Sequence, residues 1–334
     1  MKRTIINFVF ISLSLFSICK GYIAADEFPV LKGPYLGQKP PGMTPEIFAP
    51  GIVSVDEYSE FVCMFTPDGK ECIFDRYGDD EYQKGAVFIT RIKNGKWTKP
   101  EIFTLLAKYG DIFLPTLSPD GKYWFFTSKS LPLPEEAKKI IPMYFIKKTE
   151  VGWTEPEYLT QSIHASITLD GVVYVNSGRE IKSHPELKTI VDLYGSLPFE
   201  VGHPVISPDG SYLIFDNGEL AGQDDCKLFV SFKKSEGVWT DPISLGKHIK
   251  QHAFCAWITS DGKYIFFHSL DSAKGNIYWI SSEIIEQLKA DISNLDYSRV
   301  EVAVDARRRP MKLWSSTAIG PQQSRCSEIG SLEE

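Results

Sequence analysis

Ile206-Ser-Pro-Asp-Gly-Ser-Tyr-Leu-Ile-Phe215 places a tight-turn sequence between two short apolar runs. An Asp side chain accepts hydrogen bonds from the backbone of its own turn, and Gly adopts the positive φ that such a turn requires. Apolar runs on either side of these residues are typical of two antiparallel strands. The stretch therefore predicts a β-hairpin in which Asp209 and Gly210 have a structural role.

The same pattern occurs five times in the chain. The four further copies are Phe65–Phe74, Leu117–Phe126, Ile167–Val175 and Ile258–Phe267. The five turn aspartates are residues 68, 120, 170, 209 and 261, so the spacings are 52, 50, 39 and 52 by subtraction. A repeat of about fifty residues is typical of the blades of a β-propeller.

Each full unit continues with a third strand, a Trp and a short fourth strand. These second halves are Val87–Trp97 with Pro100–Phe103, Met143–Lys148 with Trp153 and Pro156–Leu159, and Leu228–Lys233 with Trp239 and Pro242–Leu245. Four short strands per unit without helical periodicity predict an all-β fold, a β-propeller of four-stranded blades. A β-sandwich does not repeat one turn sequence at this period, and the coils of a parallel β-helix are about half as long.

The number of blades depends on the short third unit, which lacks its Trp. We expect five blades, because Ile190-Val-Asp-Leu-Tyr194 can still supply a strand to the third. Six blades are the alternative if residues 176 to 200 contain a degenerate unit.

The two ends of the repeat array indicate how the ring closes. Pro45–Phe48 matches Pro100–Phe103, which is an outer fourth strand, whereas the fifth unit has Asn276–Ile280 as its third strand and no fourth. We expect the N-terminal strand to complete the last blade, which removes the open edges of a linear array.

The regions outside the repeats give the domain plan. Lys2 and Arg3, an apolar run to Ile18 and the small residues around Ala25 are typical of a secretory signal, and the run is too short for a spanning helix. We expect a signal peptide (1–25), a linker (26–43), the propeller (44–289, ending in a short helix) and a disordered tail (290–334). Export would place the mature chain in the periplasm or outside the cell, without a transmembrane segment; lipid attachment at Cys19 is the alternative.

Two cysteines flank the first turn, and the remaining cysteines fit no zinc-binding spacing. We expect Cys63 and Cys72 to face each other across the hairpin, either as a disulfide or as two buried thiols. The net charge of −7 and a basic cluster limited to Arg307–Arg309 argue against a nucleic-acid surface. We expect a monomer.

The repeats resemble the WD-like repeats of the TolB-type β-propeller family of exported bacterial proteins. The resemblance rests on the Ser-Pro-Asp-Gly motif with its aromatic and aliphatic flank, covers roughly residues 44 to 289, and departs from the pattern at Leu169 and Ser260. It implies the fold strongly and an activity weakly, because the family includes scaffolds, protein binders and propellers attached to enzymes.

Candidate ligand-binding residues lie at the end of the blades opposite the Asp-Gly turns, where the long polar loops gather; we call this end the long-loop face. The candidates are Asp75, Arg76, Asp111, His164, Arg179, Glu200, His203, Asp216, His252 and His268. Imidazoles and carboxylates around a central channel could coordinate a divalent metal or transfer protons in glycan cleavage. We assign no catalytic residue and expect no cofactor, and we assign most aromatic residues to the core.

Two functions remain after the motif search. The sequence favours a non-catalytic binding or scaffold module for a protein or glycan partner at the long-loop face. Neither a G-x-S-x-G nucleophile motif nor a sialidase-type repeat is present. The alternative is a carbohydrate-active enzyme, a glycoside hydrolase or polysaccharide lyase with or without a metal, that uses the histidines and carboxylates of the same face.

Overall fold

The fold is described from a computed structural model of the chain. The structure describes residues 28–78, 85–133, 142–177, 184–194, 197, 201–217, 227–235, 237–250, 252–270 and 274–294. The chain divides into two compact units, Met1–Val30 and Leu31–Glu334. All the helices and strands named below belong to the second unit, and the predicted signal peptide lies outside the described residues.

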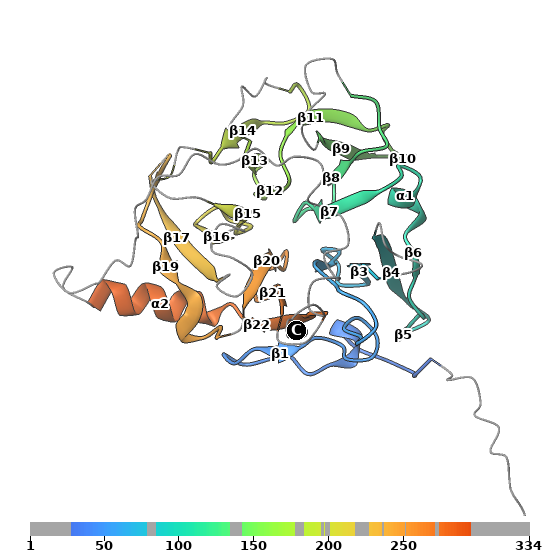
Figure 1. The fold of residues 1–334 in the computed structure, drawn as a ribbon, viewed down its shortest axis with the longest axis horizontal. Helices are drawn as coiled ribbons and strands as arrows, with labels where there is room; N and C mark the ends of the chain where they lie inside the picture. The colour runs from blue at the N-terminus through green and yellow to red at the C-terminus, as the bar shows by residue number, and fades with distance from the viewer. Residues whose placement is uncertain are drawn as a thin grey trace, which may run out of the picture. The chain divides into compact units, whose positions relative to one another are not determined.

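Five separate sheets are arranged radially around one axis, which confirms the predicted five-bladed β-propeller (Figure 1). The first blade contains β2 (Cys63–Phe65), β3 (Glu71–Arg76), β4 (Ala86–Lys93), β5 (Lys96–Trp97) and β6 (Glu101–Ile102). The second contains β7 (Ile112–Leu117), β8 (Tyr123–Ser128), β9 (Pro142–Thr149), β10 (Gly152–Trp153) and β11 (Glu157–Gln161). The third contains β12 (Ala165–Ile167), β13 (Val172–Val175) and β14 (Thr189–Asp192).

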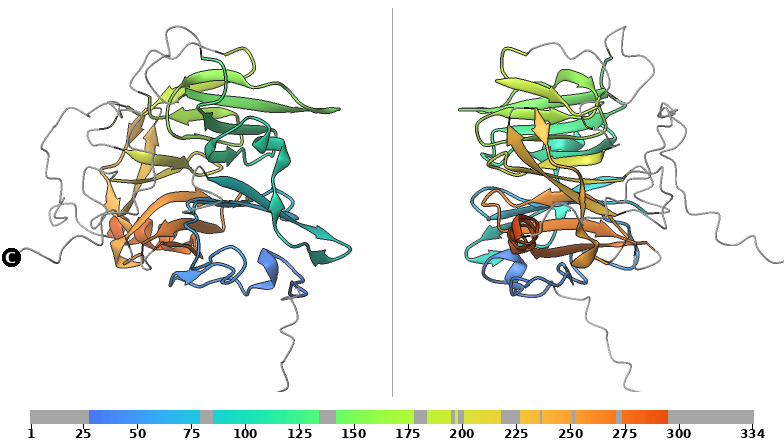
Figure 2. Two further views of the ribbon diagram at one scale, coloured as in Figure 1. Left: turned by 45° about the vertical axis from the view of Figure 1, so that its right-hand side comes forward. Right: turned by 90° about the vertical axis from the view of Figure 1, so that its left-hand side faces the viewer.

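The last two blades complete the ring. The fourth contains β15 (Gly202–Ile206), β16 (Tyr212–Asp216), β17 (Leu228–Ser235), β18 (Val238–Trp239) and β19 (Ile243–Ser244). The fifth contains β20 (Ala253–Ile258), β21 (Tyr264–Ser269), β22 (Asn276–Ser281) and β1 (Glu46–Ile47). The innermost strands are therefore β2, β7, β12, β15 and β20, and Figure 2 shows the same blades from the side.

The outer edge of three blades is covered by two short pieces instead of one fourth strand. In the first blade, β5 pairs with one end of β4 through Ile92 and Trp97, and β6 pairs with the other end through Phe88 and Ile102. The second and fourth blades repeat this arrangement along β9 and β17. Eight-residue third strands are thus paired along most of their length.

The third blade has three strands in the described residues, in keeping with its short repeat unit. Its last strand, β14, confirms the strand expected around Ile190, but it runs parallel to β13, with Val173 opposite Ile190. The strand in the third position of this sheet, β14, therefore runs in the direction expected of a fourth strand.

The ring closes as predicted, because β1 pairs with β22 through Glu46 and Trp279. Next to this pair, the hydroxyl of Ser54 donates to the carbonyl of Ile277 at 3.2 Å and accepts from its N–H at 3.1 Å. Phe48 is fully buried in the same joint. Residues 46–54 thus fasten the last blade to the first.

The Asp-Gly turns have the predicted structural role. In the first turn, Thr66 Oγ1 donates to Asp68 Oδ1 at 2.7 Å, Lys70 N donates to the same oxygen at 3.1 Å, and Gly69 has φ of 67°. The Thr66 hydroxyl holds the pKa of Asp68 below its usual value. All five turns contain this contact from a Ser or Thr to the Asp.

The two hairpin cysteines are free and buried, with their Sγ atoms 3.7 Å apart. We expected the two residues to face each other, but they are not a directly opposite pair. Cys63 is paired with Phe74, and Cys72 with Phe65. In this register the two cysteines are diagonal neighbours on adjacent strands, and their thiols meet along that diagonal.

Helical elements are few in the described part of the chain. They are η1 (Tyr35–Gly37), α1 (Thr104–Ala107), η5 (Leu245–Lys247) and α2 (Glu283–Asn294). Ile284, Ile285 and Leu288 of α2 are buried against the fourth and fifth blades. The helix ends beyond residue 289, the predicted end of the propeller, and the remainder of the tail lies outside the described residues. No helix in the described ranges is long and apolar enough to cross a membrane.

Candidate functional site

Three inner strands carry a β-bulge at one register, six residues before the turn Asp. The bulged residues are Leu114, His203 and Cys255, with φ of 45°, 37° and 50°. Positive φ is uncommon outside Gly, and bulges redirect side chains. Leu114 has the same conformation although its side chain is apolar, so the bulge is a recurring feature of the blades and is not specific to polar residues. In the fourth and fifth blades it brings His203 and Cys255 to adjacent places near the axis.

His203 and Asp216 form the closest pair among the predicted site residues. His203 Nδ1 lies 2.9 Å from Asp216 Oδ2, and the same oxygen accepts from Cys255 N at 3.2 Å. Burial lowers the pKa of His203, but the neighbouring Cys255 and the Asp216 carboxylate outweigh it, so the pKa lies well above its usual value. The pair therefore links the fourth blade to the fifth.

His164 links three blades and is buried. Its Nδ1 lies 2.8 Å from the Pro204 carbonyl, so Nδ1 carries the proton, and Nε2 accepts from Thr116 Oγ1 at 3.3 Å. Burial lowers the pKa of His164 to about 4. The ring is neutral at pH 7, as both hydrogen bonds require.

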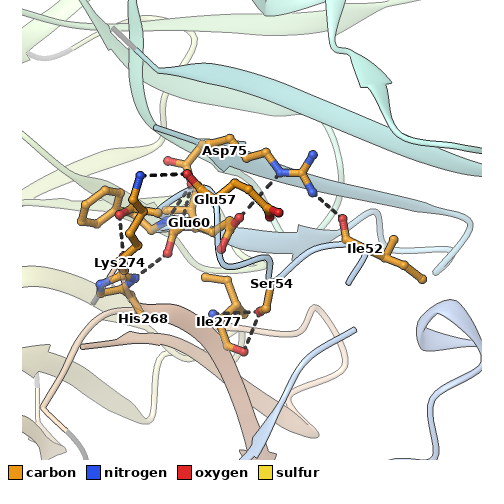
Figure 3. A network of polar contacts seen from close by, with 12 residues as sticks. Ile52, Ser54, Glu57, Glu60, Asp75, His268, Lys274 and Ile277 are labelled. Carbon is orange, nitrogen blue, oxygen red and sulfur yellow. Dashed lines mark hydrogen bonds and ion pairs between the residues drawn. The ribbon is translucent and has the colours of Figure 1, made fainter. Parts of the chain in front are cut away.

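His268 makes the corresponding link between the fifth and first blades (Figure 3). Its Nδ1 donates to the carbonyl of Glu60 at 2.5 Å, and its side chain is fully buried. Burial lowers the pKa of His268 to about 4. Nearby, Ser59 Oγ donates to the Lys274 carbonyl and Lys274 Nζ donates to the Glu57 carbonyl, so the joint is tied at several points.

Two carboxyl groups of the first blade, those of Glu60 and Asp75, are buried near this joint. Asp75 Oδ1 accepts from the N–H groups of Phe61 and Val62 at 2.8 and 2.9 Å. Glu60 Oε1 lies 3.6 Å from Arg76 Nε, and Arg76 Nη2 donates to the carbonyl of Ile52. Burial raises the pKa of Glu60 to about 9 and that of Asp75 to about 7. The backbone hydrogen bonds of Asp75 hold Phe61 and Val62 in place before β2, and Glu60 faces Arg76 in an ion pair.

Four predicted site residues remain. Asp111 is partly exposed at the start of β7, and His252 is exposed before β20. Arg179 and Glu200 lie outside the described residues. Within the described ranges, no group of three or more His, Cys, Asp or Glu side chains is placed to hold a metal ion.

A continuous run of aromatic side chains lies at the long-loop end of the inner strands in four blades. We call it the collar; its partly exposed members are Phe61, Tyr77, Phe113, His203 and Phe254. The centroids of Phe113 and Tyr77 are 6.3 Å apart, those of Tyr77 and Phe61 5.1 Å, those of Phe61 and Phe254 6.0 Å, and those of Phe254 and His203 6.4 Å. The collar therefore runs through the second, first, fifth and fourth blades, and His203 lies 6.4 Å from His164 of the third.

The collar was missed in the sequence because aromatic residues on hairpin strands were assigned to the core. A signal was present: Phe61, Phe113 and Phe254 each stand seven residues before the turn Asp of their repeat. In β7 and β20 this residue is paired, Phe113 with Thr127 and Phe254 with His268, and it comes directly before the bulge. An aromatic residue at the same position of several repeats can thus indicate a surface feature.

The opposite end of the axis is different in character. A narrow hollow there is lined mostly by apolar side chains of four inner strands, among them Leu117, Ile167, Val205 and Trp257. Thr116, Ser166 and Ser260 are the polar residues of its lining. The predicted site residues that the structure describes are not part of this lining.

No protein-family model and no curated protein sequence matches the chain. The fold is similar to that of a TolB-like protein from Agrobacterium tumefaciens, with 14% identity over 64% of this chain and 71% of that chain and a TM-score of 0.37. It is also similar to a xylan β-1,4-xylosidase from Bacillus halodurans (14% identity, 69% and 54% covered, TM-score 0.41). A mannose phosphorylase from Leishmania mexicana is a third neighbour (12% identity, 71% and 88% covered, TM-score 0.37). Similarity at this level carries no information on ligand or activity.

Proposed function

We propose that this chain is an exported β-propeller that binds a protein or glycan partner through its long-loop face and performs no catalysis. One observation carries the proposal. The polar side chains of this face that the structure describes are largely buried and link the blades, whereas the collar leaves aromatic side chains partly exposed at the centre of the face. Partly exposed aromatic residues are typical of binding surfaces.

A glycoside hydrolase, one form of the catalytic alternative, typically uses two carboxyl groups that face the bound sugar, about 5 to 10 Å apart. Three predicted or neighbouring carboxylates, those of Glu60, Asp75 and Asp216, are 0%, 1% and 1% exposed. Asp75 and Asp216 also accept backbone hydrogen bonds. Among the described residues, these groups are better suited to holding strands than to reaching a substrate.

A pair of variants in the second blade tests the choice of face. Phe113→Glu places a charge in the collar, and Val151→Glu places the same charge in the β9–β10 turn at the other end of the blade, where Val151 is 99% exposed. We expect the full mature chain to retain material from an extract of the producing cells. Phe113→Glu should lose this capture, and Val151→Glu should keep it, with both variants folded by thermal denaturation.

Two results would contradict the proposal. One is loss of capture in Val151→Glu with capture retained in Phe113→Glu, which would move the binding surface to the turn end. The other is cleavage of polysaccharide substrates by the purified chain that exceeds the rate of a vector-only preparation.

A further inference from the structure

The collar is the surface feature of the long-loop face on which the proposed function rests. Its five aromatic side chains come from four different blades. One face of Phe61 lies on His268, at 4.7 Å between centroids and 21° between planes. The exposed part of the Phe61 side chain is therefore the part of the ring that His268 does not cover.

The size of the collar limits what it can bind. A stable protein interface buries about 800 Å² on each partner and involves roughly 20 to 30 residues a side. The collar consists of five side chains whose neighbouring ring centroids are 5.1 to 6.4 Å apart. Contacts of this extent suit one or two small rings better than a protein surface.

The chemistry of the collar is both apolar and polar. Lys129 is exposed, and its Nζ lies 5.7 Å from the centroid of Phe113. The side chain of His203 is 18% exposed beside Phe254. A pyranose ring has an apolar C–H face, which can lie against an aromatic ring, and a rim of hydroxyls, which need hydrogen-bond donors and acceptors at the edge.

We propose that the collar is a glycan-binding site that takes the apolar face of a pyranose ring on Phe61, Phe113 and Phe254, with Lys129 and His203 at its edge. The inference rests on the proposed function and specifies its ligand class. A protein partner that uses the same face is the outcome against which it is tested.

The probes are three soluble oligosaccharides, xylohexaose, mannohexaose and cellohexaose, added separately to the full mature chain. Saturation-transfer difference NMR should detect transfer to the ring C–H protons of at least one probe. Phe254→Leu and Phe61→Leu keep apolar volume but remove the ring, and each should weaken binding roughly three- to tenfold. Tyr264→Leu is the control, because Tyr264 is also a half-buried aromatic but lies at the turn end.

The outcomes separate this inference from the proposed function. Binding that is weakened in the two Phe variants and unchanged in Tyr264→Leu supports it. If the two Phe variants and Tyr264→Leu all bind the oligosaccharide as tightly as the wild type, the collar is not the site. The inference also fails if no probe shows saturation transfer. If no probe binds while Phe113→Glu still abolishes capture of a cellular partner, the glycan inference fails and the proposed function stands.

Discussion

His164 and His268 illustrate how buried titratable groups serve the propeller. Each donates from Nδ1 to a backbone carbonyl of the next blade, and each is held neutral by burial. A histidine placed in this way positions a strand, so the presence of several imidazoles around an axis does not by itself indicate catalysis. At the residue scale, what distinguishes a link from a reactive group is the partner of each ring nitrogen.

Acidification should weaken the fold through these two histidines. The unfolded chain takes up protons near the usual His pKa of 6.5, whereas the folded chain does so only near 4. The stabilisation is therefore present above pH 6.5 and is lost as the pH falls toward 4. Because Glu60 and Asp75 act in the opposite direction over this range, the test is a difference: from pH 7 to pH 5 the urea midpoint of the wild type should shift downward relative to that of His268→Asn. An equal slope in the variant would contradict this assignment.

Glu60 should act in the opposite direction. Its pKa is raised to about 9 in the folded chain, so the folded state holds a proton that the unfolded state releases near 4.5. Stability should therefore decline as the pH rises from about 4.5 to about 9. Glu60→Gln imitates the protonated acid and should be more stable than the wild type at pH 9, by on the order of a few kcal/mol.

The measurement for Glu60 is the free energy of unfolding in urea at pH 6 and pH 9. Glu101→Gln is a matched control, since Glu101 is exposed and pairs with Arg91 on the surface. A gain at pH 9 in both variants, or in neither, would show that the burial of Glu60 does not set the pH dependence.

At the scale of the element, the hairpin turn is stabilised by its Asp more than by its ion pair. In the fifth blade, Asp261 Oδ1 accepts from Thr259 Oγ1 at 2.7 Å and from Lys263 N at 3.1 Å, while Oδ2 lies 3.0 Å from Lys263 Nζ. Asp261→Ala should destabilise the protein by about 1 kcal/mol, because it removes these local hydrogen bonds. Lys263→Ala removes an exposed ion pair and should change stability by less than about 0.5 kcal/mol. Equal losses in thermal denaturation would refute this distinction.

The elements that recur in the sequence could be predicted, and those that depend on tertiary placement could not. Asp209 and Gly210 predict their hairpin from local chemistry alone, and the match of Phe48 to Phe103 predicts the closing strand. The parallel pairing of β14 was not accessible, because a short spacing shows that residues are missing without showing which strand they formed. Nor does sequence alone reveal the bulge at Leu114, which has no glycine to mark its positive φ.

The candidate site was predicted less well than the fold, for a physical reason. His203 and Asp216 were both selected, and the structure pairs them. Their polarity, however, also suits them to link neighbouring blades, and residue type alone does not separate this role from ligand binding. Phe254 was left out because burial is the usual state of an aromatic residue on a strand.

For the molecule as a whole, the joint between the last and first blades should determine stability. Phe48 packs against Phe266 and Trp279 of the fifth blade at 5.0 and 5.1 Å, and against Phe65 of the first at 5.8 Å. Phe48→Ala should cost about 3 to 5 kcal/mol, because it leaves a cavity where the ring is fastened.

Ile47→Ala is the matched control for the joint. Ile47 precedes Phe48 in the closing segment but is 36% exposed, so its truncation should cost less than about 1 kcal/mol. Denaturation in urea compares the two variants. A loss in Ile47→Ala as large as that in Phe48→Ala would mean that strand pairing, and not the buried aromatic contact, closes the ring.

The location of the binding surface at the collar is the central claim, and hydrogen–deuterium exchange tests it directly. The full mature chain is compared with and without an oligosaccharide that binds it in the NMR experiment. We predict slower exchange at the long-loop ends of the inner strands, around residues 61–62, 113–114 and 254–255, and no change at the five Asp-Gly turns. Slower exchange at the turns, with the collar unaffected, would contradict the account.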